Sequence, residues 1–465
     1  MILPRLIVAD EIHEGKTPMS LLLIQALRNK KVPLNVFFCA RKEEDLRLMS
    51  LMSDVSVSCL DAYTMSSPRN LKTLFQRRAS PDALNIISVP LGMAIDAKTF
   101  QTFPEGPELA KILNCGVIPI LAASTVAVIS AATALSVLSS FDEIVPDRVL
   151  GIVFSSMKNP REFQLLEKEF NRRSATLTLG FTPSTADCAM PTMRAMSSAN
   201  PALPTIPVKS AALQLGGQAR QIDWQLLEAF SYLDAEWAAP EGLNYQSRHM
   251  SVAVVGAPAS LEGEGNLEVF RLMGCDPQPY DHRKDPFPIG ADVLYLPHMI
   301  GEPYIEELLS DPKFREGMLA SVRGNKLILA TGASALLFGA SYRTSDQRKI
   351  DGLKLFPYNA IAARDPHARR AKTKRVEMRG IGDTCFTANN EKMRGYAVGG
   401  FTISNPGNLA APCLSYRDMR EDVESGLSGW ANSHCFVTDL RLDLWSALDT
   451  VHRWLGQRQR IPRAR

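Results

Sequence analysis

The start of the chain places a strand, a loop and a helix in the order of a phosphate-binding loop. Apolar residues from Leu6 to Ala9 indicate a buried strand, and Pro18 to Arg28 has the pattern of an amphipathic helix. The loop between them ends in Gly15, Lys16 and Thr17. We expect these three residues to hold the phosphates of ATP and its Mg²⁺, because backbone N–H groups and a lysine at a helix start bind phosphate. A plain helix cap with a solvated lysine is the alternative interpretation.

The charge of this loop argues against tight phosphate binding. Ala9 stands where a nucleotide-binding loop has an early glycine, and Asp10, Glu11 and Glu14 add three carboxylates. A carboxylate about 5 Å from a phosphate repels it by roughly 3 kcal/mol at an effective dielectric constant of about 20. We therefore expect an ATP site that is impaired.

The composition is that of a globular protein with little net charge. Of the 465 residues, 45% are hydrophobic and 22% are charged, and the net charge of +3 is too small to indicate a nucleic acid partner. We interpret the basic stretch from Arg369 to Arg375 as a solvated face, and the arginine-rich end from Arg453 to Arg465 as a frayed terminus. Eight cysteines without a CxxC pair, and histidines without ligand spacing, predict no metal site and a reducing cytoplasm.

One segment is long and apolar enough to raise the question of a membrane span. Residues Ile112 to Phe141 carry no charge. The segment begins with a β-branched run around Val117 and continues with alanine, serine and leucine. A buried parallel strand followed by a helix packed on its sheet has the same pattern. We therefore expect no membrane span.

Strands and helices alternate twice along the chain, which is typical of doubly wound parallel sheets. In the first part we expect strands at Leu6–Ala9, Leu34–Cys39, Ser56–Leu60, Asn85–Val89, Val117–Ala122, Leu150–Phe154 and Thr178–Gly180, with helices at Pro18–Arg28, Arg69–Arg77, Thr125–Ser139 and Pro160–Arg173. In the second part we expect strands at Ser251–Val255, Val293–Pro297 and Leu327–Ala330, with helices at Leu267–Met273 and Tyr304–Val322. The predicted domains are residues 1–185 and 249–465, joined by a proline-rich segment and helix at 186–248.

Six short motifs follow one another in a fixed order. They are Ala9–Thr17, Cys59–Met65, Ala110–Leu113, Val149–Phe154, Tyr295–Pro297 with Glu302, and Leu329–Gly332. In this order they resemble the cobyrinate a,c-diamide synthase family, which joins a dethiobiotin-synthetase-like ATP domain to a class I glutamine-amidotransferase domain. The resemblance implies an α/β chain whose first sheet is P-loop NTPase-like and whose second is glutamine-amidotransferase-like.

The resemblance also implies that the glutaminase has lost its nucleophile. Such enzymes place a thiolate at a sharp strand-to-helix turn, and that position is Gly332. Ser334 lies two residues further on, inside the expected helix start. The region of the partner histidine, Arg394 to Phe401, contains none, and His434 follows later. We expect that the chain does not hydrolyse glutamine.

Further changes implied by the resemblance fall in the ATP domain. A lysine of the family falls on Cys39, a glutamate on Ser88, an aspartate on Ala123 and an asparagine on Ser155. Phosphoryl transfer depends on positioning and charge neutralisation, so these losses add to that at Ala9. Asp61 is retained, and the resemblance implies a catalytic role for it. A simple turn residue is the alternative.

Two functions from different classes remain open. The first is a degenerate, non-catalytic paralogue that acts as a subunit, or as a carrier or sensor of an anionic or tetrapyrrole-like ligand. The second is an ATP-dependent amide ligase in which Lys16, Thr17 and Asp61 activate a carboxylate as an acyl phosphate. Its nitrogen would come from ammonia, an amine or the glutaminase of a partner. A GTPase-like switch or a partitioning ATPase would leave the second sheet unexplained. The resemblance further implies a homodimer, or a heteromer with an active homologue.

Overall fold

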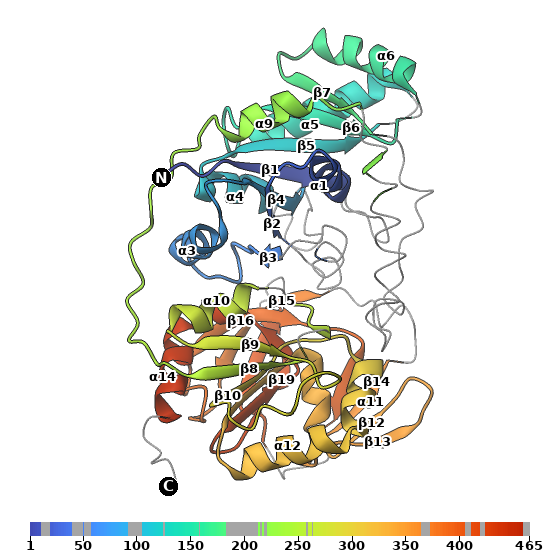
Figure 1. Ribbon diagram of the computed structural model, residues 1–465. Coiled ribbons are helices and arrows are strands. Elements are labelled where there is room, and N and C mark those ends of the chain that lie inside the picture. The colour runs from blue at the N-terminus through green and yellow to red at the C-terminus, as the bar shows by residue number, and fades with distance from the viewer. Residues whose placement is uncertain are drawn as a thin grey trace.

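The chain forms two stacked α/β units in the computed structural model (Figure 1). The structure describes residues 1–10, 19–39, 50, 57–91, 105–123, 126–157, 159–182, 213, 216–217, 221–256, 259–262, 264–363, 373–404, 411–418 and 424–458. We call the first sheet and its helices the N-terminal unit, and the remaining sheets and helices the C-terminal unit.

The N-terminal unit is built on a seven-stranded parallel sheet with the order β3-β2-β4-β1-β5-β6-β7. All seven strands expected from the sequence are present. Both faces of the sheet are covered, so its strands are continuous apolar runs rather than alternating ones. The strands are β1 (Arg5–Asp10), β2 (Leu34–Phe38), β3 (Val57–Cys59), β4 (Leu84–Pro90), β5 (Gly116–Ala122), β6 (Gly151–Ser155) and β7 (Leu177–Phe181).

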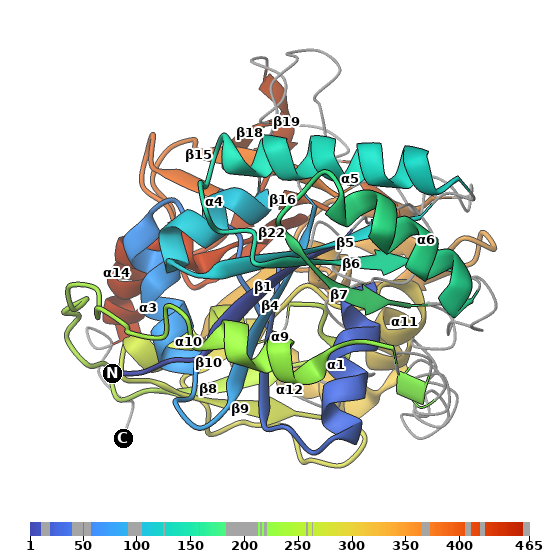
Figure 2. The same ribbon diagram turned by 90° about the horizontal axis from the view of Figure 1, so that it is seen from above.

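The helices of this unit lie on both faces of its sheet, as Figure 2 shows for α5 and α6 on one face and α1 and α9 on the other. Side chains of α1 and α9 pack with Leu6 and Val8, whereas those of the other four helices pack with Ile7 and Ala9. The sequence did not predict α4. The helices are α1 (Met19–Asn29), α3 (Pro68–Arg78), α4 (Glu105–Leu113), α5 (Ala127–Asp142), α6 (Pro160–Asn171) and α9 (Trp224–Ser231).

The uncharged segment from Ile112 to Phe141 forms β5 and most of α5, as expected. Among the described residues, no helix has both the length and the apolar character needed to cross a membrane.

The C-terminal unit begins with a second, six-stranded sheet of order β20-β21-β11-β10-β8-β9. Its strands are parallel except for β20 at one edge. The three strands predicted from the sequence are among them. The strands are β8 (Ser251–Val255), β9 (Asp276–Tyr280), β10 (Val293–Leu296), β11 (Leu327–Thr331), β20 (Trp430–Ala431) and β21 (Cys435–Thr438).

The predicted helix from Tyr304 to Val322 is wrong as a single element, because the structure divides it in two. Asp311 ends the first helix, and its side chain accepts a hydrogen bond from the backbone N–H of Lys313 to begin the second. Pro312 at the first position has no N–H to continue the earlier helix. The helices of this unit are α10 (Gly265–Leu272), α11 (Glu302–Ser310), α12 (Pro312–Arg323) and α14 (Leu448–Arg458), with short 3₁₀ turns η2 (Gly332–Leu337) and η3 (Leu444–Ser446).

Two further sheets in the C-terminal unit were not predicted. One has the order β13-β12-β14-β17 and the other β19-β18-β15-β16-β22. In the second sheet, β15 and β16 form an antiparallel pair that faces the N-terminal unit (Figure 1). The strands are β12 (Ser341–Arg343), β13 (Lys349–Asp351), β14 (Asn359–Ala362), β15 (Lys374–Gly380), β16 (Lys392–Ala397), β17 (Phe401–Ser404), β18 (Leu414–Asp418), β19 (Glu424–Ser428) and β22 (Leu440–Leu442).

One apolar core runs through both units. It includes Phe75 on α3 and Phe270 on α10, together with Trp445 in η3. Trp237 packs against Phe75 with ring centroids 5.1 Å apart. The two units therefore share buried apolar surface, which holds the loops at the ends of their strands against each other.

Candidate functional site

Asp61 lies where the two units meet. It follows β3 directly and is fully buried. One carboxylate oxygen, Oδ1, accepts hydrogen bonds from the backbone N–H groups of Tyr63 at 2.9 Å and Thr64 at 3.3 Å. This turn holds the second oxygen, Oδ2, toward the C-terminal unit.

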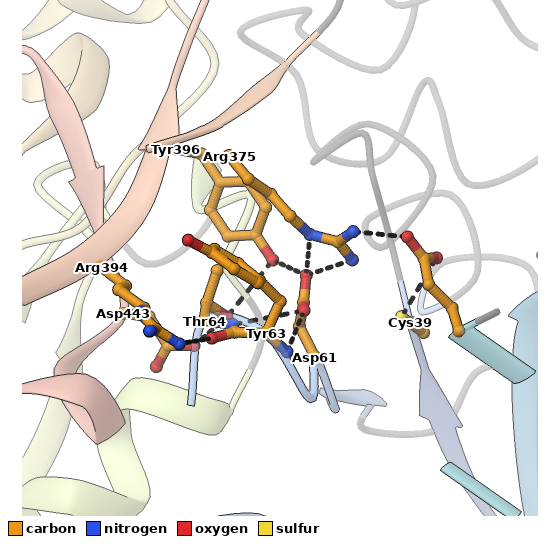
Figure 3. Close-up of polar contacts among 9 residues, drawn as sticks. Cys39, Asp61, Tyr63, Thr64, Arg375, Arg394, Tyr396 and Asp443 are labelled. Carbon is orange, nitrogen blue, oxygen red and sulfur yellow. Dashed lines mark hydrogen bonds and ion pairs between the residues drawn. The ribbon is translucent and has the colours of Figure 1, made fainter. Parts of the chain in front are cut away.

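The partners of that second oxygen come from β15 and β16. Arg375 donates to Asp61 Oδ2 from Nε at 2.9 Å and from Nη2 at 2.8 Å, and the hydroxyl of Tyr396 donates to the same oxygen (Figure 3). Nη1 of Arg375 donates to Glu105, the first residue of α4. One guanidinium of the C-terminal unit therefore pairs with two carboxylates of the N-terminal unit.

The interpretation of residues 369–375 as a solvated face is wrong for Arg375. Its side chain is only 17% exposed. It alternates along β15 with Val376, which points to the opposite, buried face of the sheet. A basic run looks solvated in sequence, but no sequence pattern reveals that two carboxylates from distant elements neutralise one of its members.

The cluster stabilises its own charges. Burial alone would raise the pKa of Asp61, but Arg375 and the hydroxyl of Tyr396 outweigh burial and lower it. Burial likewise opposes the charge of Arg375, yet Asp61 and Glu105 raise the pKa of that guanidinium well above its ordinary value. Five donors reach the two oxygens of Asp61, which offer about four lone-pair sites. The hydrogen-bonding capacity of Asp61 is thus filled, and its catalytic role remains a prediction.

Tyr63 extends the contact along the sheet of the C-terminal unit. The guanidinium of Arg394 lies 4.7 Å from the centre of the Tyr63 ring, and that of Arg375 lies 5.7 Å from it. Nη1 of Arg394 also donates to the backbone oxygen of Tyr63 at 2.9 Å. The ring is therefore held by two cation–π contacts from the opposite unit.

Asp443 forms a second carboxylate contact between the units. Thr64 Oγ1 donates to Asp443 Oδ2, and the backbone N–H of Trp445 donates to Oδ1 at 3.1 Å. Burial raises the pKa of Asp443 to about 6. This carboxyl group therefore changes charge at a higher pH than an ordinary aspartate.

Cys39, at the position implied for a lysine, is buried beside the same cluster. Its Sγ donates to Glu105 Oε2 at 3.8 Å. Burial first, and then the charge of Glu105, raise the pKa of the thiol well above its ordinary value. Cys39 stays protonated, so it supplies neither the positive charge of a lysine nor a reactive thiolate.

The predicted phosphate-binding residues Gly15, Lys16 and Thr17 lie outside the described residues. Asp10, just before them, is buried, and its Oδ2 accepts a hydrogen bond from the backbone N–H of Ser20 at 2.8 Å. A carboxylate therefore occupies the amino end of α1, where a phosphate would otherwise gain from the helix dipole.

The changed positions Ser88, Ala123 and Ser155 lie along the carboxyl edge of the sheet of the N-terminal unit. Ser88 on β4 lies level with Val8, which precedes Ala9 on β1, and its hydroxyl is 2.6 Å from that of Ser20. Ser155 ends β6, and its backbone oxygen accepts from Ala123 N at 2.8 Å. Ser88 and Ala123, which directly follows β5, present a hydroxyl and a methyl group where the resemblance implies carboxylates, and Ser155 presents a hydroxyl where it implies an asparagine. Carboxylates are the usual protein ligands of Mg²⁺.

The strand-to-helix turn at Gly332 has the geometry of a nucleophile elbow. Gly332 follows β11 directly and has φ of +60°, a conformation that favours glycine. A Cβ atom at this position would lie 2.4 Å from Nδ1 of His298. The same Nδ1 accepts a hydrogen bond from Ala333 N at 3.0 Å. His298 therefore occupies both the space of a nucleophile and the backbone N–H that would stabilise an oxyanion.

Ser334 does not replace the missing nucleophile, because its hydroxyl donates to the backbone oxygen of Pro297. His434 precedes β21, whereas Gly332 follows β11. Thr331 lies level with Thr438 in this parallel pair. The four residues from His434 to Thr438 span about 13 Å, so His434 stands at the opposite edge of the sheet from the turn.

A buried carboxylate, that of Glu262, binds the backbone of His298. Glu262 accepts from the backbone N–H of His298 at 2.8 Å and from Thr331 Oγ1 at 3.0 Å. The hydroxyl of Tyr295 and Nδ2 of Asn266, at 2.9 Å, donate to its other oxygen. No sequence pattern points to Glu262, and His298 is one of the histidines without ligand spacing. Their contact joins residues 36 positions apart, which no local pattern reveals.

Within the described ranges, no group of three or more histidine, cysteine, aspartate or glutamate side chains is arranged to hold a metal ion.

Comparison of the sequence with known proteins finds distant relatives. No family model matches the chain. Proteins named cobyrinate a,c-diamide synthase match it from Listeria innocua, with 20% identity over 353 residues, and from Listeria monocytogenes, with 22% identity over 346 residues. Each of these matches covers 72% of this chain and 74% of the relative. The protein of the same name from Limosilactobacillus reuteri is 21% identical over 326 residues, or 70% of each chain.

Two solved structures match parts of the chain. A glutamine amidotransferase covers 45% of it at 10% identity, with a TM-score of 0.32. The MinD cell division protein of Aquifex aeolicus covers 47% at 11% identity, with a TM-score of 0.30. The chain is thus distantly similar, over about 72% of its length, to proteins named cobyrinate a,c-diamide synthase.

Proposed function

We propose that the chain is a non-catalytic relative of the cobyrinate a,c-diamide synthases, and that it acts by binding rather than by turnover. In this proposal it keeps the scaffold of an amidating ATP enzyme, has lost the glutaminase, and has an impaired ATP site. It would serve as a subunit of an active homologue, or as a carrier or sensor of an anionic or tetrapyrrole-type ligand. The observation that carries the proposal is the occupied turn at Gly332.

Glutamine hydrolysis needs a nucleophile and an oxyanion site at that turn. Gly332 has no side chain to attack an amide. The backbone N–H of Ala333, the following residue, already donates to His298. A substitution at one position would remove only the nucleophile. Here the imidazole of His298 occupies the space of the missing side chain and also accepts the hydrogen bond of the backbone N–H.

The N-terminal unit supports the same proposal independently. Asp10 places a negative charge at the amino end of α1. Ser88 and Ala123 stand where the resemblance implies carboxylates that position Mg²⁺. A repulsion of even 1.4 kcal/mol weakens binding tenfold, so ATP affinity is expected to fall well below that of an intact site.

A second candidate is an ATP-dependent amide ligase without its own glutaminase. The observation in its favour is that Gly15, Lys16 and Thr17 retain the residue types of a phosphate-binding loop. Asp61 would then take part in activating a substrate carboxylate. This requires Asp61 to exchange at least one of its present donors for substrate or metal.

Titration calorimetry with Mg-ATP separates the two candidates. The proposal predicts no saturable heat at ATP concentrations up to the millimolar range, for the wild type and for Lys16→Ala alike. A micromolar site that Lys16→Ala abolishes would favour the ligase and overturn the proposal. The Listeria innocua synthase, titrated in parallel, provides the positive control.

A further inference from the structure

The units touch on one side through contacts near the connecting chain. Figure 1 shows α3 directly above α10 on that side. Arg77 on α3 pairs with Glu268 on α10, with 3.0 Å between Nε and Oε2. Asn70 donates from Nδ2 to the backbone oxygen of Trp445 at 2.8 Å. The connecting chain also contacts α3, because Nη2 of Arg69 on that helix donates to the backbone oxygen of Gly242 at 2.6 Å. We call these contacts the hinge side.

A second contact is different in kind. We call Arg375, Asp61 and Glu105 the latch. Its cation stands on β15, while its two anions stand on separate elements of the N-terminal unit, after β3 and at the start of α4. The side chains of Asp61 and Glu105 are 1% and 8% exposed. All three charges are therefore largely removed from water.

We propose that the latch holds the two units in a closed arrangement, and that the units separate about the hinge side when it is broken. Removing the guanidinium leaves two buried carboxylates without this cation. Asp61 keeps its hydrogen bonds from Tyr63, Thr64 and Tyr396, but these donors are uncharged, so both carboxylates gain further stabilisation from water. Opening supplies that water. Because one side chain carries both ion pairs, they are lost together, which makes the contact all-or-none rather than gradual.

Neighbouring contacts act in the same direction as the latch. Tyr63 is held between Arg375 and Arg394, and Tyr396 donates to Asp61, so an aromatic ring from each unit packs beside the ion pairs. These contacts also cross between the units. The proposal does not depend on the proposed function, because an active ligase with this structure would close by the same contact.

The test compares Arg375→Met with Arg348→Met in the full chain. Arg348 also pairs with two carboxylates, Glu306 and Asp346, but its side chain is 55% exposed and all three lie within the C-terminal unit. Small-angle scattering measures the radius of gyration, which is about 23 Å for a compact chain of this length. Differential scanning calorimetry measures whether the units unfold together.

For Arg375→Met we expect a radius of gyration larger by about 1 Å or more, and two unfolding transitions in place of one. Arg348→Met is expected to match the wild type in both. A folded Arg375→Met with an unchanged radius and a single transition would overturn the proposal.

The triple variant Asp61→Asn, Glu105→Gln, Arg375→Met covers the case in which Arg375→Met fails to fold. It removes all three charges and leaves no buried ion unpaired. Because no unpaired buried charge then favours opening, this variant is expected to fold and to stay closed by the same two measurements. If it opens or fails to fold, lost packing rather than unpaired charge explains the effect of Arg375→Met, and the proposal is wrong.

Discussion

The turn at Gly332 and the latch at Arg375 are both buried polar sites whose groups bond to each other, but they differ in what they join. At the turn, His298 and Gly332 follow neighbouring strands of one sheet, and the contact with Ala333 N is between uncharged groups. At the latch, Asp61 and Arg375 are 314 residues apart and belong to different units. The first contact lies within one sheet, whereas the second joins two units. We therefore expect the contact at the turn to be fixed by the sheet, and the contact at the latch to depend on how the two units are placed.

The largest effect expected from this comparison is at the latch. Arg375→Met should lower the free energy of unfolding by about 3–5 kcal/mol, because it leaves Asp61 and Glu105 buried without their cation. Urea titration followed by circular dichroism measures this change. Arg348→Met, at an exposed pair, should change stability by less than about 1 kcal/mol. Equal losses in the two variants would remove the distinction between a buried and a surface ion pair.

Even a methyl side chain at Gly332 should destabilise the turn. Gly332→Ala should cost about 2–4 kcal/mol, from the left-handed backbone and from the approach of Cβ to His298. Adding His298→Ala should recover part of this loss, because the two substitutions share one contact. Thermal or urea unfolding of the two single variants and the double variant measures the coupling. Strict additivity would show that the imidazole does not fill the nucleophile space.

The pH dependence of stability tests the contacts around the latch, because Asp443 and Asp61 are ionisable and their pKa values are shifted in opposite directions. The raised pKa of Asp443, about 6, means that its contribution is fully present below pH 4 and is lost as pH rises to about 6. The loss should reach up to about 3 kcal/mol. Asp443→Asn should flatten this part of the profile, since an amide keeps a partner for Thr64 without a charge. The lowered pKa of Asp61 acts in the opposite sense, so its contribution is lost only as pH falls below about 4. An unchanged profile in Asp443→Asn would contradict the assignment.

The smallest effect concerns the ring between two guanidinium groups. Arg394→Met should lower stability by about 1 kcal/mol, the size of one partly buried cation–π contact and its hydrogen bond. Arg394→Lys should keep the charge near the Tyr63 ring and recover about half of that loss. Chemical denaturation with matched slopes resolves differences of this size. A loss as large as that of Arg375→Met would mean that Tyr63, rather than the ion pair, dominates the contact.

The sequence predicted the two parallel sheets because their strands are apolar runs bounded by loops, as at Leu6 to Ala9 and Val117 to Ala122. The sequence also predicted helices at the places of α3 and α6. In the structure both begin with a capping residue and a proline. The strands from β12 to β22 were not predicted, since several alternate charged and apolar residues, as at Lys374 to Gly380.

The candidate site could be predicted only in part. The resemblance singled out Asp61 and Gly332, and both lie at contacts that the structure describes. Their partners, Arg375 and His298, could not be found from sequence, because tertiary packing alone brings them together. Lys16 and its neighbours lie outside the described residues, so their role stays a prediction.

We expect that the chain does not carry out the amidation for which its relatives are named. The most direct test is one reaction containing the purified chain, glutamine, Mg-ATP and cobyrinate, in which ammonia, ADP and amide product are measured together. The Listeria innocua synthase serves as the positive control. We predict that none of the three products exceeds the protein-free blank, either with glutamine or with added ammonium. If ammonium gives amide product together with ADP, the chain is an active ligase and the proposed function is wrong. If glutamine gives amide product, the chain also hydrolyses glutamine, and the proposed loss of the nucleophile at Gly332 is wrong too.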